Sequence, residues 1–286
     1  VQGEADLASL MKDAIYEELI ANRLIVTISG ANSLGEPLEV PPSLAERATL
    51  KQTSTLGLYM NDIRPLSNRL LANLFRRLRT AGSEAQPSHY ASVERLHIGF
   101  SEVGREGMQE LQELLVSDDC KIKSMDLSFA AVEGWPLMQA LKGNKSLTSL
   151  DVRSVPGLAK VYDTIATQLL DPNSVSRLAC LRCDAFDLRE STKLLSVQEE
   201  PLEVSSIRLI AGLLKNNTQL LELDLTASDV EDKGATTLAS VLPANTTLTR
   251  IMLEFNSALT AEGRKALREA AATSDNARAA PLRLDF

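Results

Sequence analysis

The chain has 286 residues, of which 44% are hydrophobic and only 4% are aromatic, so we expect a core of aliphatic side chains. Its net charge of -8 and pI near 5.0 exclude nucleic acid as the main partner, because phosphate binding requires a basic face. Three cysteines are too few to indicate a disulfide framework, and no apolar run reaches the roughly 18 residues of a membrane span.

The first 49 residues differ in pattern from the rest. Apolar residues spaced three and four apart predict a helix over Ala5–Ala21, and Leu24–Ile28 is typical of a buried strand. Residues 29–43 contain glycines and prolines and predict a loop. We expect residues 1–49 to cap the first layer of the domain that follows, since the end of a repeat stack must be covered. Docking of a partner is the alternative role.

From residue 50 onward one phrase recurs, in which apolar residues stand at its first, fourth and sixth positions. Its copies begin at Val93, Ile122, Leu147, Val175, Leu220 and Leu248. Weaker copies are Thr53-Leu56-Leu58 and Ala279-Leu282-Leu284. Each phrase is short and alternating, so it predicts one strand. Four of the five steps between copies are 25 to 29 residues long, which is typical of a solenoid.

The remaining step, from Val175 to Leu220, is 45 residues long and predicts an insertion near 184–204. Helical stripes separate the phrases, for example over Met108–Leu115 and Leu209–Leu214. A strand–helix unit cannot cover its own apolar face, so neighbouring units must stack with parallel strands. Helices are wider than strands, so the stack must curve. The sequence therefore predicts an α/β solenoid over 50–286, a horseshoe with strands on the concave face and helices on the convex face.

Several polar motifs receive structural interpretations. Asn144, Asn216 and Asn245 match the glycosylation acceptor pattern, but each stands where a helix should end before a strand. The pair Cys180-x-x-Cys183 is predicted to pack in the core, with a redox or metal site as the alternative.

Four further features could mark a site. Residues 76–79 contain three arginines and are predicted to cap a helix end, a local basic patch being the alternative. His97 and His89 lack the neighbours that a catalytic or zinc site needs, and Trp135 is predicted to be core rather than a ligand platform.

The residues between the inward apolar positions should face one surface, because strand side chains alternate. Three aspartates, Asp126, Asp151 and Asp224, could meet a basic partner there, or could simply be solvated. The candidate partner-binding residues are Arg95, His97, Asp126, Asp151, Arg153, Arg177, Glu222, Asp224, Arg250 and Met252.

The stretch from Leu220 to Leu267 resembles the ribonuclease-inhibitor type of leucine-rich repeat, with LxxLxL, a turn, an apolar residue, Gly and a helix. The segments Lys142–Leu147 and Lys215–Leu220 are similar to that family's joint between helix and strand. The chain departs from the family three residues after the last strand leucine, where only Asn256 keeps the usual Asn. The resemblance implies protein binding rather than chemistry.

We therefore expect a non-catalytic scaffold for protein–protein interaction, without cofactor or metal, that is a subunit of a larger hetero-complex. It would bind through the concave face, the insertion or the N-terminal helix. The alternative is a regulator of a partner enzyme, of the GTPase-activating or inhibitor type. Free thiols indicate a reducing, intracellular compartment such as the cytoplasm. An organelle reached after removal of a targeting peptide is the alternative.

Overall fold

The computed structural model describes residues 28–29, 55–59, 71–72, 74–76, 78–80, 94–99, 102–274 and 281–286. Contacts divide the chain into two compact units, Val1–Leu158 and Ala159–Phe286. The helix predicted over Ala5–Ala21 and most of the predicted cap lie outside the described residues, so the boundary after residue 49 stays a prediction.

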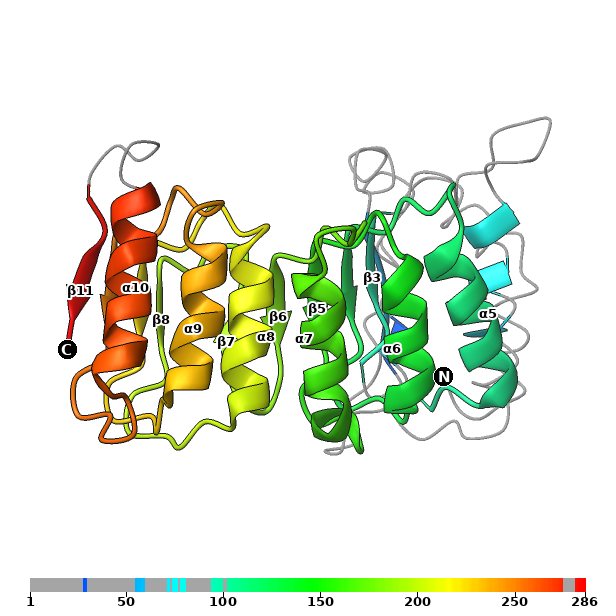
Figure 1. Ribbon diagram of the computed structural model, residues 1–286. Helices are drawn as coiled ribbons and strands as arrows, with labels where there is room; N and C mark the ends of the chain where they lie inside the picture. Colours follow the sequence, from blue (N-terminus) through cyan, green and yellow to red (C-terminus); the bar gives the residue numbers. More distant parts are fainter. Residues whose placement is uncertain are drawn as a thin grey trace, which may run out of the picture. The chain divides into compact units, whose positions relative to one another are not determined.

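The first unit alternates strands and helices along the chain (Figure 1). Its elements are β1 (Ile28–Ser29), β2 (Thr55–Tyr59), β3 (Arg95–His97), α5 (Arg105–Val116), β4 (Ser124–Asp126), α6 (Gly134–Gly143) and β5 (Ser149–Asp151). The five strands pair in chain order and all pairs are parallel, as predicted. Helices α5 and α6 pack against each other.

The second unit continues the alternation with one interruption. Its elements are η2 (Leu158–Val161), α7 (Tyr162–Leu170), β6 (Cys180–Arg182), β7 (Asp187–Leu188), β8 (Leu194–Ser196), α8 (Val204–Leu214), β9 (Glu222–Asp224), α9 (Asp232–Val241), β10 (Arg250–Met252), α10 (Ala261–Ser274) and β11 (Arg283–Asp285). Strands β8 to β11 are parallel, whereas β6 and β7 form an antiparallel pair. Helices α7 to α10 pack in chain order.

The core consists of aliphatic residues repeated once per strand. The central residue of each strand and the residue two positions later are buried, as at Leu96 and Ile98 or Leu223 and Leu225. Neighbouring central residues pair directly, for example Met125 with Leu150 and Leu223 with Ile251. Burial of one such side chain stabilises the fold by about 1.5–3 kcal/mol. The predicted inward-facing phrase is confirmed at β3, β4, β5, β9 and β10.

Buried asparagines join the end of each helix to the next strand. Asn144 donates through Nδ2 to the carbonyl of Leu115 at 2.7 Å, and its Oδ1 accepts the N–H of Leu147 at 2.7 Å. Asn217 and Asn245 repeat this arrangement and are equally buried. The structural interpretation of these motifs is confirmed, although in the second of them Asn217 is the buried residue rather than Asn216.

The predicted register is wrong at two strands. The centre of β6 is Leu181, so its phrase is Leu178-Leu181-Cys183, and Val175 is exposed. The centre of β11 is Leu284, which pairs with Ile251. Both errors have one cause, because apolar residues three apart fit the phrase in either of two registers.

The segment 184–204, predicted to be an insertion, contains strands of its own. β7 folds back on β6, and β8 pairs in parallel with β9. Leu195 at the centre of β8 is buried and lies 14 residues after Leu181. The chain thus forms a second strand after β6 without a helix between them.

Candidate functional site

The outward strand face of each unit is formed by the two residues that flank the buried centre of each strand. In the first unit these residues are Arg95 and His97, Ser124 and Asp126, and Ser149 and Asp151. In the second unit the parallel strands present Leu194 and Ser196, Glu222 and Asp224, Arg250 and Met252, and Arg283 and Asp285. Nine of the ten predicted partner-binding residues therefore lie on these strands or directly after them; Arg177 does not.

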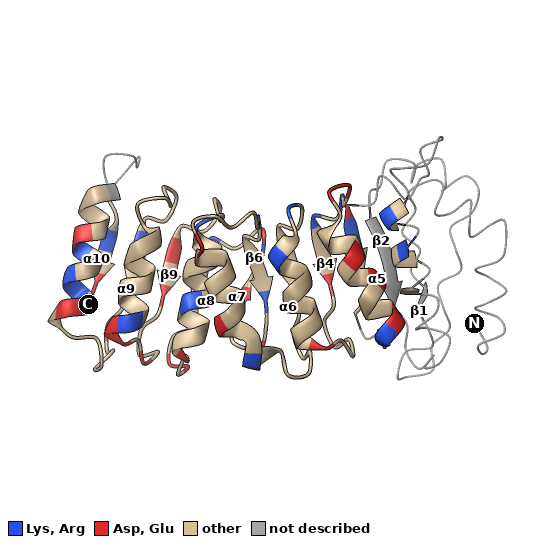
Figure 2. Cartoon of the chain, turned by 45° about the vertical axis from the view of Figure 1, so that its right-hand side comes forward, with Lys and Arg blue, Asp and Glu red and all other residues tan. Residues whose placement is uncertain are grey.

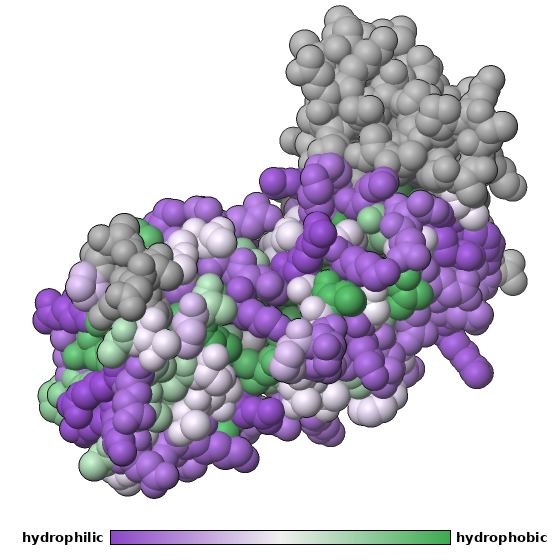
Figure 3. All heavy atoms as spheres, turned by 45° about the horizontal axis from the view of Figure 1, so that its top comes forward, coloured by the Kyte–Doolittle hydropathy of each residue, from purple (hydrophilic) through white to green (hydrophobic). Residues whose placement is uncertain are grey.

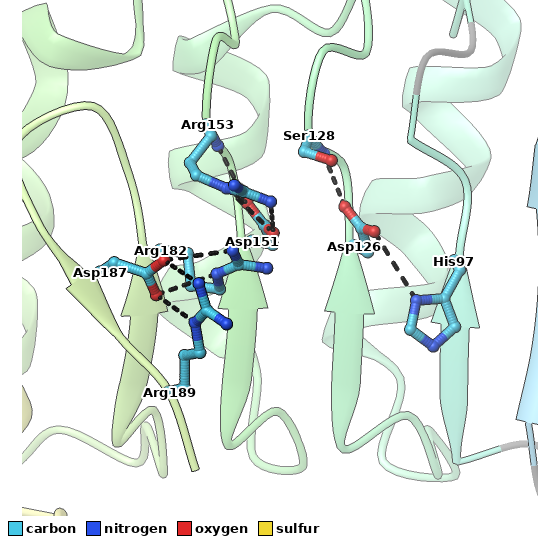
Figure 4. A network of polar contacts seen from close by, with 8 residues as sticks. All are labelled: His97, Asp126, Ser128, Asp151, Arg153, Arg182, Asp187 and Arg189. Atoms are coloured by element: carbon cyan, nitrogen blue, oxygen red, sulfur yellow. Dashed lines mark hydrogen bonds and ion pairs between the residues drawn. The ribbon is translucent and has the colours of Figure 1, made fainter. Parts of the chain in front are cut away.

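Asp126 is held by its neighbours on the first unit (Figure 4). Its Oδ1 accepts the N–H of Ser128 at 2.9 Å, and its Oδ2 lies 3.7 Å from Nδ1 of His97. Burial alone would raise the pKa of this carboxyl, but the hydrogen bonds from His97 and Ser128 outweigh burial and lower the pKa. Asp126 is therefore an ionised and positioned acceptor.

Asp151 forms the tightest ion pair of this face. Arg153 donates through Nε to Oδ1 at 3.0 Å and through Nη2 to Oδ2 at 2.8 Å, and its backbone N–H also donates to Oδ1. Figure 4 shows the guanidinium of Arg153 turned back onto this carboxylate. The like charges of Asp126 and Asp151, which are paired in register, are thus each answered within the chain.

The hypothesis that three aspartates present a row of open carboxylates is not supported for two of them. Asp151 is only 5% exposed and Asp224 only 8%. Asp224 accepts the N–H of Thr226 at 3.0 Å and lies 3.4 Å from the hydroxyl of Ser196. Each carboxylate bends along the end of its strand to accept the N–H two residues later, an Asx-type turn. These side chains stabilise strand ends rather than await a partner.

The second unit carries a chain of charges across β9, β10 and β11. Arg250 donates through Nε to Oδ2 of Asp285 at 2.6 Å and lies 3.8 Å from Glu222. Arg283 donates to the other oxygen of Asp285 at 2.7 Å. Burial would raise the pKa of Asp285, but Arg250 and Arg283 lower it overall. Glu222, Arg250 and Met252 remain partly accessible.

At β6 the correction of the register replaces one predicted residue by another. Arg177 is exposed and precedes the strand, whereas Arg182 is the residue that flanks its centre. Arg182 and Arg189 both donate to Asp187 at 2.9 Å (Figure 4). The hydrogen bond from Arg189, followed by the one from Arg182, lowers the pKa of Asp187 to about 2 although burial opposes this shift.

The arginines of residues 76–79 contact acids of α5. Arg76 and Arg79 donate to the two oxygens of Glu110 at 2.8 and 3.0 Å. Arg79 also lies 3.0 Å from Glu113. These two arginines therefore join helices and do not form an open basic patch.

The cysteine pair is structural. Cys180 and Cys183 are buried and free, and burial raises the pKa of Cys180 to about 11. Burial also raises the pKa of Cys183, although Tyr162 and backbone groups hydrogen-bond to its sulfur. Residues three apart on a strand point to opposite faces and are about 10 Å apart, too far for a disulfide. The prediction of core packing is confirmed.

Exposed apolar side chains occur where the sequence did not predict them. Trp135 in the first turn of α6 is 60% exposed, so the prediction that it is core is wrong. Phe129 is 50% exposed and Phe255 87%. The face seen in Figure 3 carries its hydrophobic residues as separate groups among hydrophilic ones.

Two searches of the described residues returned nothing. No helix there is long and apolar enough to cross a membrane. No group of three or more His, Cys, Asp or Glu side chains in the same residues could hold a metal ion.

The geometry defines an α/β repeat fold with parallel strands and an interaction surface rather than a chemical centre. Residues 216–239 match the family model described as leucine-rich repeat, and this match supports a leucine-rich repeat protein. That segment contains Asn217, β9 and most of α9, so it coincides with one structural repeat.

No curated protein matches the chain. Among solved structures, a crystal structure of a protein from Bacteroides fragilis is 13% identical, with a TM-score of 0.30. The match covers 81% of this chain and 64% of that one. A likeness at that TM-score establishes no common fold.

Proposed function

We propose that this protein is a non-catalytic scaffold that binds a protein partner through its outward strand faces and serves as a subunit of a hetero-complex. Leucine-rich repeats generally mediate interaction between proteins. The observation that supports this proposal most directly is the repeated placement of polar side chains, in register, on neighbouring parallel strands. We further propose that the repeats stack as a solenoid of the ribonuclease-inhibitor type.

Preorganised charges favour this function. Arg250 is fixed by Asp285 and Arg153 by Asp151, so these side chains would lose little conformational freedom when a partner binds. The accessible members of the faces, such as Arg95 and Glu222, would then determine which partner fits. Charge complementarity at such positions governs specificity and association rate more than affinity.

The test is affinity purification of the intact chain, with the stoichiometry of any complex measured by native mass spectrometry. We expect a partner at a fixed ratio, and its loss in Arg95→Glu or in Glu222→Lys, according to which unit it contacts. The matched control is Lys142→Gln, which removes a charge from exposed α6 and should retain the partner. If both face variants and the control retained every partner equally, the strand faces would not be the binding surface.

A regulator of a partner enzyme remains the second candidate. It would require an arginine able to reach the partner's active site, yet Arg153 and Arg250 are each held by an aspartate of this chain. Arg95 and Arg177 are the exposed arginines to replace by Ala. A change in the turnover of a co-purified enzyme would favour the regulator over the passive scaffold.

A further inference from the structure

One position in each repeat has a left-handed backbone. It lies four residues after the strand centre and is occupied by Phe129, Ser154, Glu199, Ala227 and Phe255, with φ between 53° and 61°. The repeat geometry imposes this conformation, because the N–H of Glu199 donates to the carbonyl of Thr226 and that of Ala227 to the carbonyl of Glu254. Residues with bulky side chains rarely adopt it.

Phe255 is therefore an unfavourable choice for stability. Its side chain is 87% exposed, so its ring contributes little burial to offset the strained backbone. Ala227 occupies the equivalent position one strand away, so a small residue is accommodated in this conformation. An exposed aromatic residue at such a position is what a binding anchor would require.

Phe255 belongs to a surface that we call the acidic loop edge, formed by residues 197–203, 225–231 and 253–260. These three connections from strand to helix are tied together by hydrogen bonds. Leu202 donates its N–H to the carbonyl of Ser228 at 3.1 Å, and Oδ1 of Asn256 accepts the N–H of Ser228 and of Val230. Glu199, Ala227 and Phe255 thus lie on adjacent strands at roughly 4.8 Å spacing.

The acidic loop edge contains six acids and no lysine or arginine. The acids are Glu199, Glu200, Glu203, Asp229, Glu231 and Glu254. Five are exposed, and no ion pair joins any of the six to a cation within the described parts of the chain. Figure 2 shows acidic residues where α8 and α9 begin. The helix dipole accounts for Glu203 and Glu231 at the N-caps, but its effect is confined to the first turn and does not reach Glu199, Glu200 or Glu254.

We propose that the acidic loop edge of the second unit binds a basic segment of a partner protein, with Phe255 as the apolar anchor. The inference rests on the proposed function and adds to it the charge of the partner and a second contact surface. The occupant carries lysine or arginine side chains that meet the carboxylates, and an apolar side chain that packs on the ring of Phe255. Burial of this ring supplies affinity, while the carboxylates speed association and orient the segment.

The test uses the intact chain and a displayed library of random peptides of about 12 residues, with Phe255→Ala as the counter-selection target. Enriched peptides should be basic and contain a large apolar residue. A synthesised representative should bind Phe255→Ala at least about tenfold more weakly than the original chain. It should bind the double variant Glu199→Gln/Glu200→Gln about threefold more weakly, a difference that shrinks as salt is raised.

Phe129→Ala is the matched control, since it removes an exposed phenylalanine from the same backbone conformation in the first unit. It should bind the peptide as the original chain does. Enriched peptides without positive charge, or equal binding to Phe255→Ala, would overturn the inference. A natural partner that is lost in Glu222→Lys but retained by Phe255→Ala would also overturn it while leaving the proposed function intact.

Discussion

The second unit contains both the most regular and the least regular part of the repeat pattern. From β9 to β10 the strand centres Leu223 and Ile251 are 28 residues apart, with α9 between them. From β6 to β8 the centres Leu181 and Leu195 are 14 residues apart, and the hairpin strand β7 takes the place of a helix. Both parts keep the inward apolar residues. The difference teaches that a repeat of this kind can omit its helix as long as its strand still covers the core.

The hydrogen bonds that join repeats differ between the two parts, and this difference predicts the largest effect. Asn245 in the regular part donates to the carbonyls of Leu214 and Asn217 and accepts the N–H of Leu248 at 2.9 Å. Because Asn245→Ala would leave these buried groups unpaired, we expect the free energy of unfolding to fall by about 2–4 kcal/mol in urea denaturation.

The comparison variant is Asn216→Ala, next to the irregular part. Asn216 is only half-buried and donates to the carbonyls of Ser176 and Leu178 at 3.0 and 3.1 Å. Water can replace these bonds, so a loss of about 0.5–1.5 kcal/mol is expected. A larger loss for Asn216→Ala than for Asn245→Ala would reverse the ranking of the two joints.

Helix packing provides the next test. A Cβ at Gly212 of α8 would lie 2.7 Å from Cβ of Leu169 on α7, whereas one at Gly234 of α9 would lie 3.1 Å from Cγ2 of Ile207. The stem of Leu169 cannot swing away, so Gly212→Ala should lower the free energy of unfolding by about 1–3 kcal/mol.

Gly234→Ala should change stability by less than about 1 kcal/mol, because Ile207 can shift slightly and alanine favours a helix. Thermal denaturation of both variants measures the contrast. Equal losses would mean that α7 and α8 pack no more closely than α8 and α9.

The hairpin of the irregular part should show a dependence on pH. The pKa of Asp187 is lowered to about 2, below the roughly 3.9 of an unfolded chain. A lowered pKa gives stability that is fully present above pH of about 4 and is lost as the pH falls towards 2. The Asp187 side chain is 36% exposed, so solvent screening limits the contribution to about 0.5–1 kcal/mol.

Asp187→Asn should therefore be less stable than the original chain at pH 7 and equally stable near pH 2. Urea denaturation across this range measures the difference. The control Glu200→Gln changes an exposed carboxylate of the same unit and should show no such convergence. A difference that persisted unchanged at low pH would exclude the ion pairs with Arg182 and Arg189 as its source.

The smallest effect concerns the thiols. Burial raises the pKa of Cys180 to about 11 and also raises that of Cys183. At pH 8 both should react with an alkylating reagent only as fast as the chain opens, and an oxidant should not join them. Mass spectrometry of the native and the urea-unfolded chain makes the comparison. Rapid alkylation of either thiol in the native chain would contradict the burial at β6.

The regular part could be predicted because its signals agree. Leu220, Leu223 and Leu225 fit one register only, and the following helix has a single apolar stripe. The irregular part could not, because Leu178 fits the phrase as either its first or its fourth residue. The strand at Leu195 was missed because its phrase begins with the polar Thr192. The positive φ of Phe255 left no signal, since glycine or asparagine would have been expected there.

By itself the sequence determined that strands and helices alternate and which side chains face the core, because both follow from the local spacing of apolar residues. The tertiary structure alone decided which residues remain available to a partner. Asp151 and Asp224 have the spacing of exposed residues, yet backbone N–H groups and a neighbouring arginine or serine hold them in place. Such hydrogen bonds depend on groups that meet only when the chain has folded.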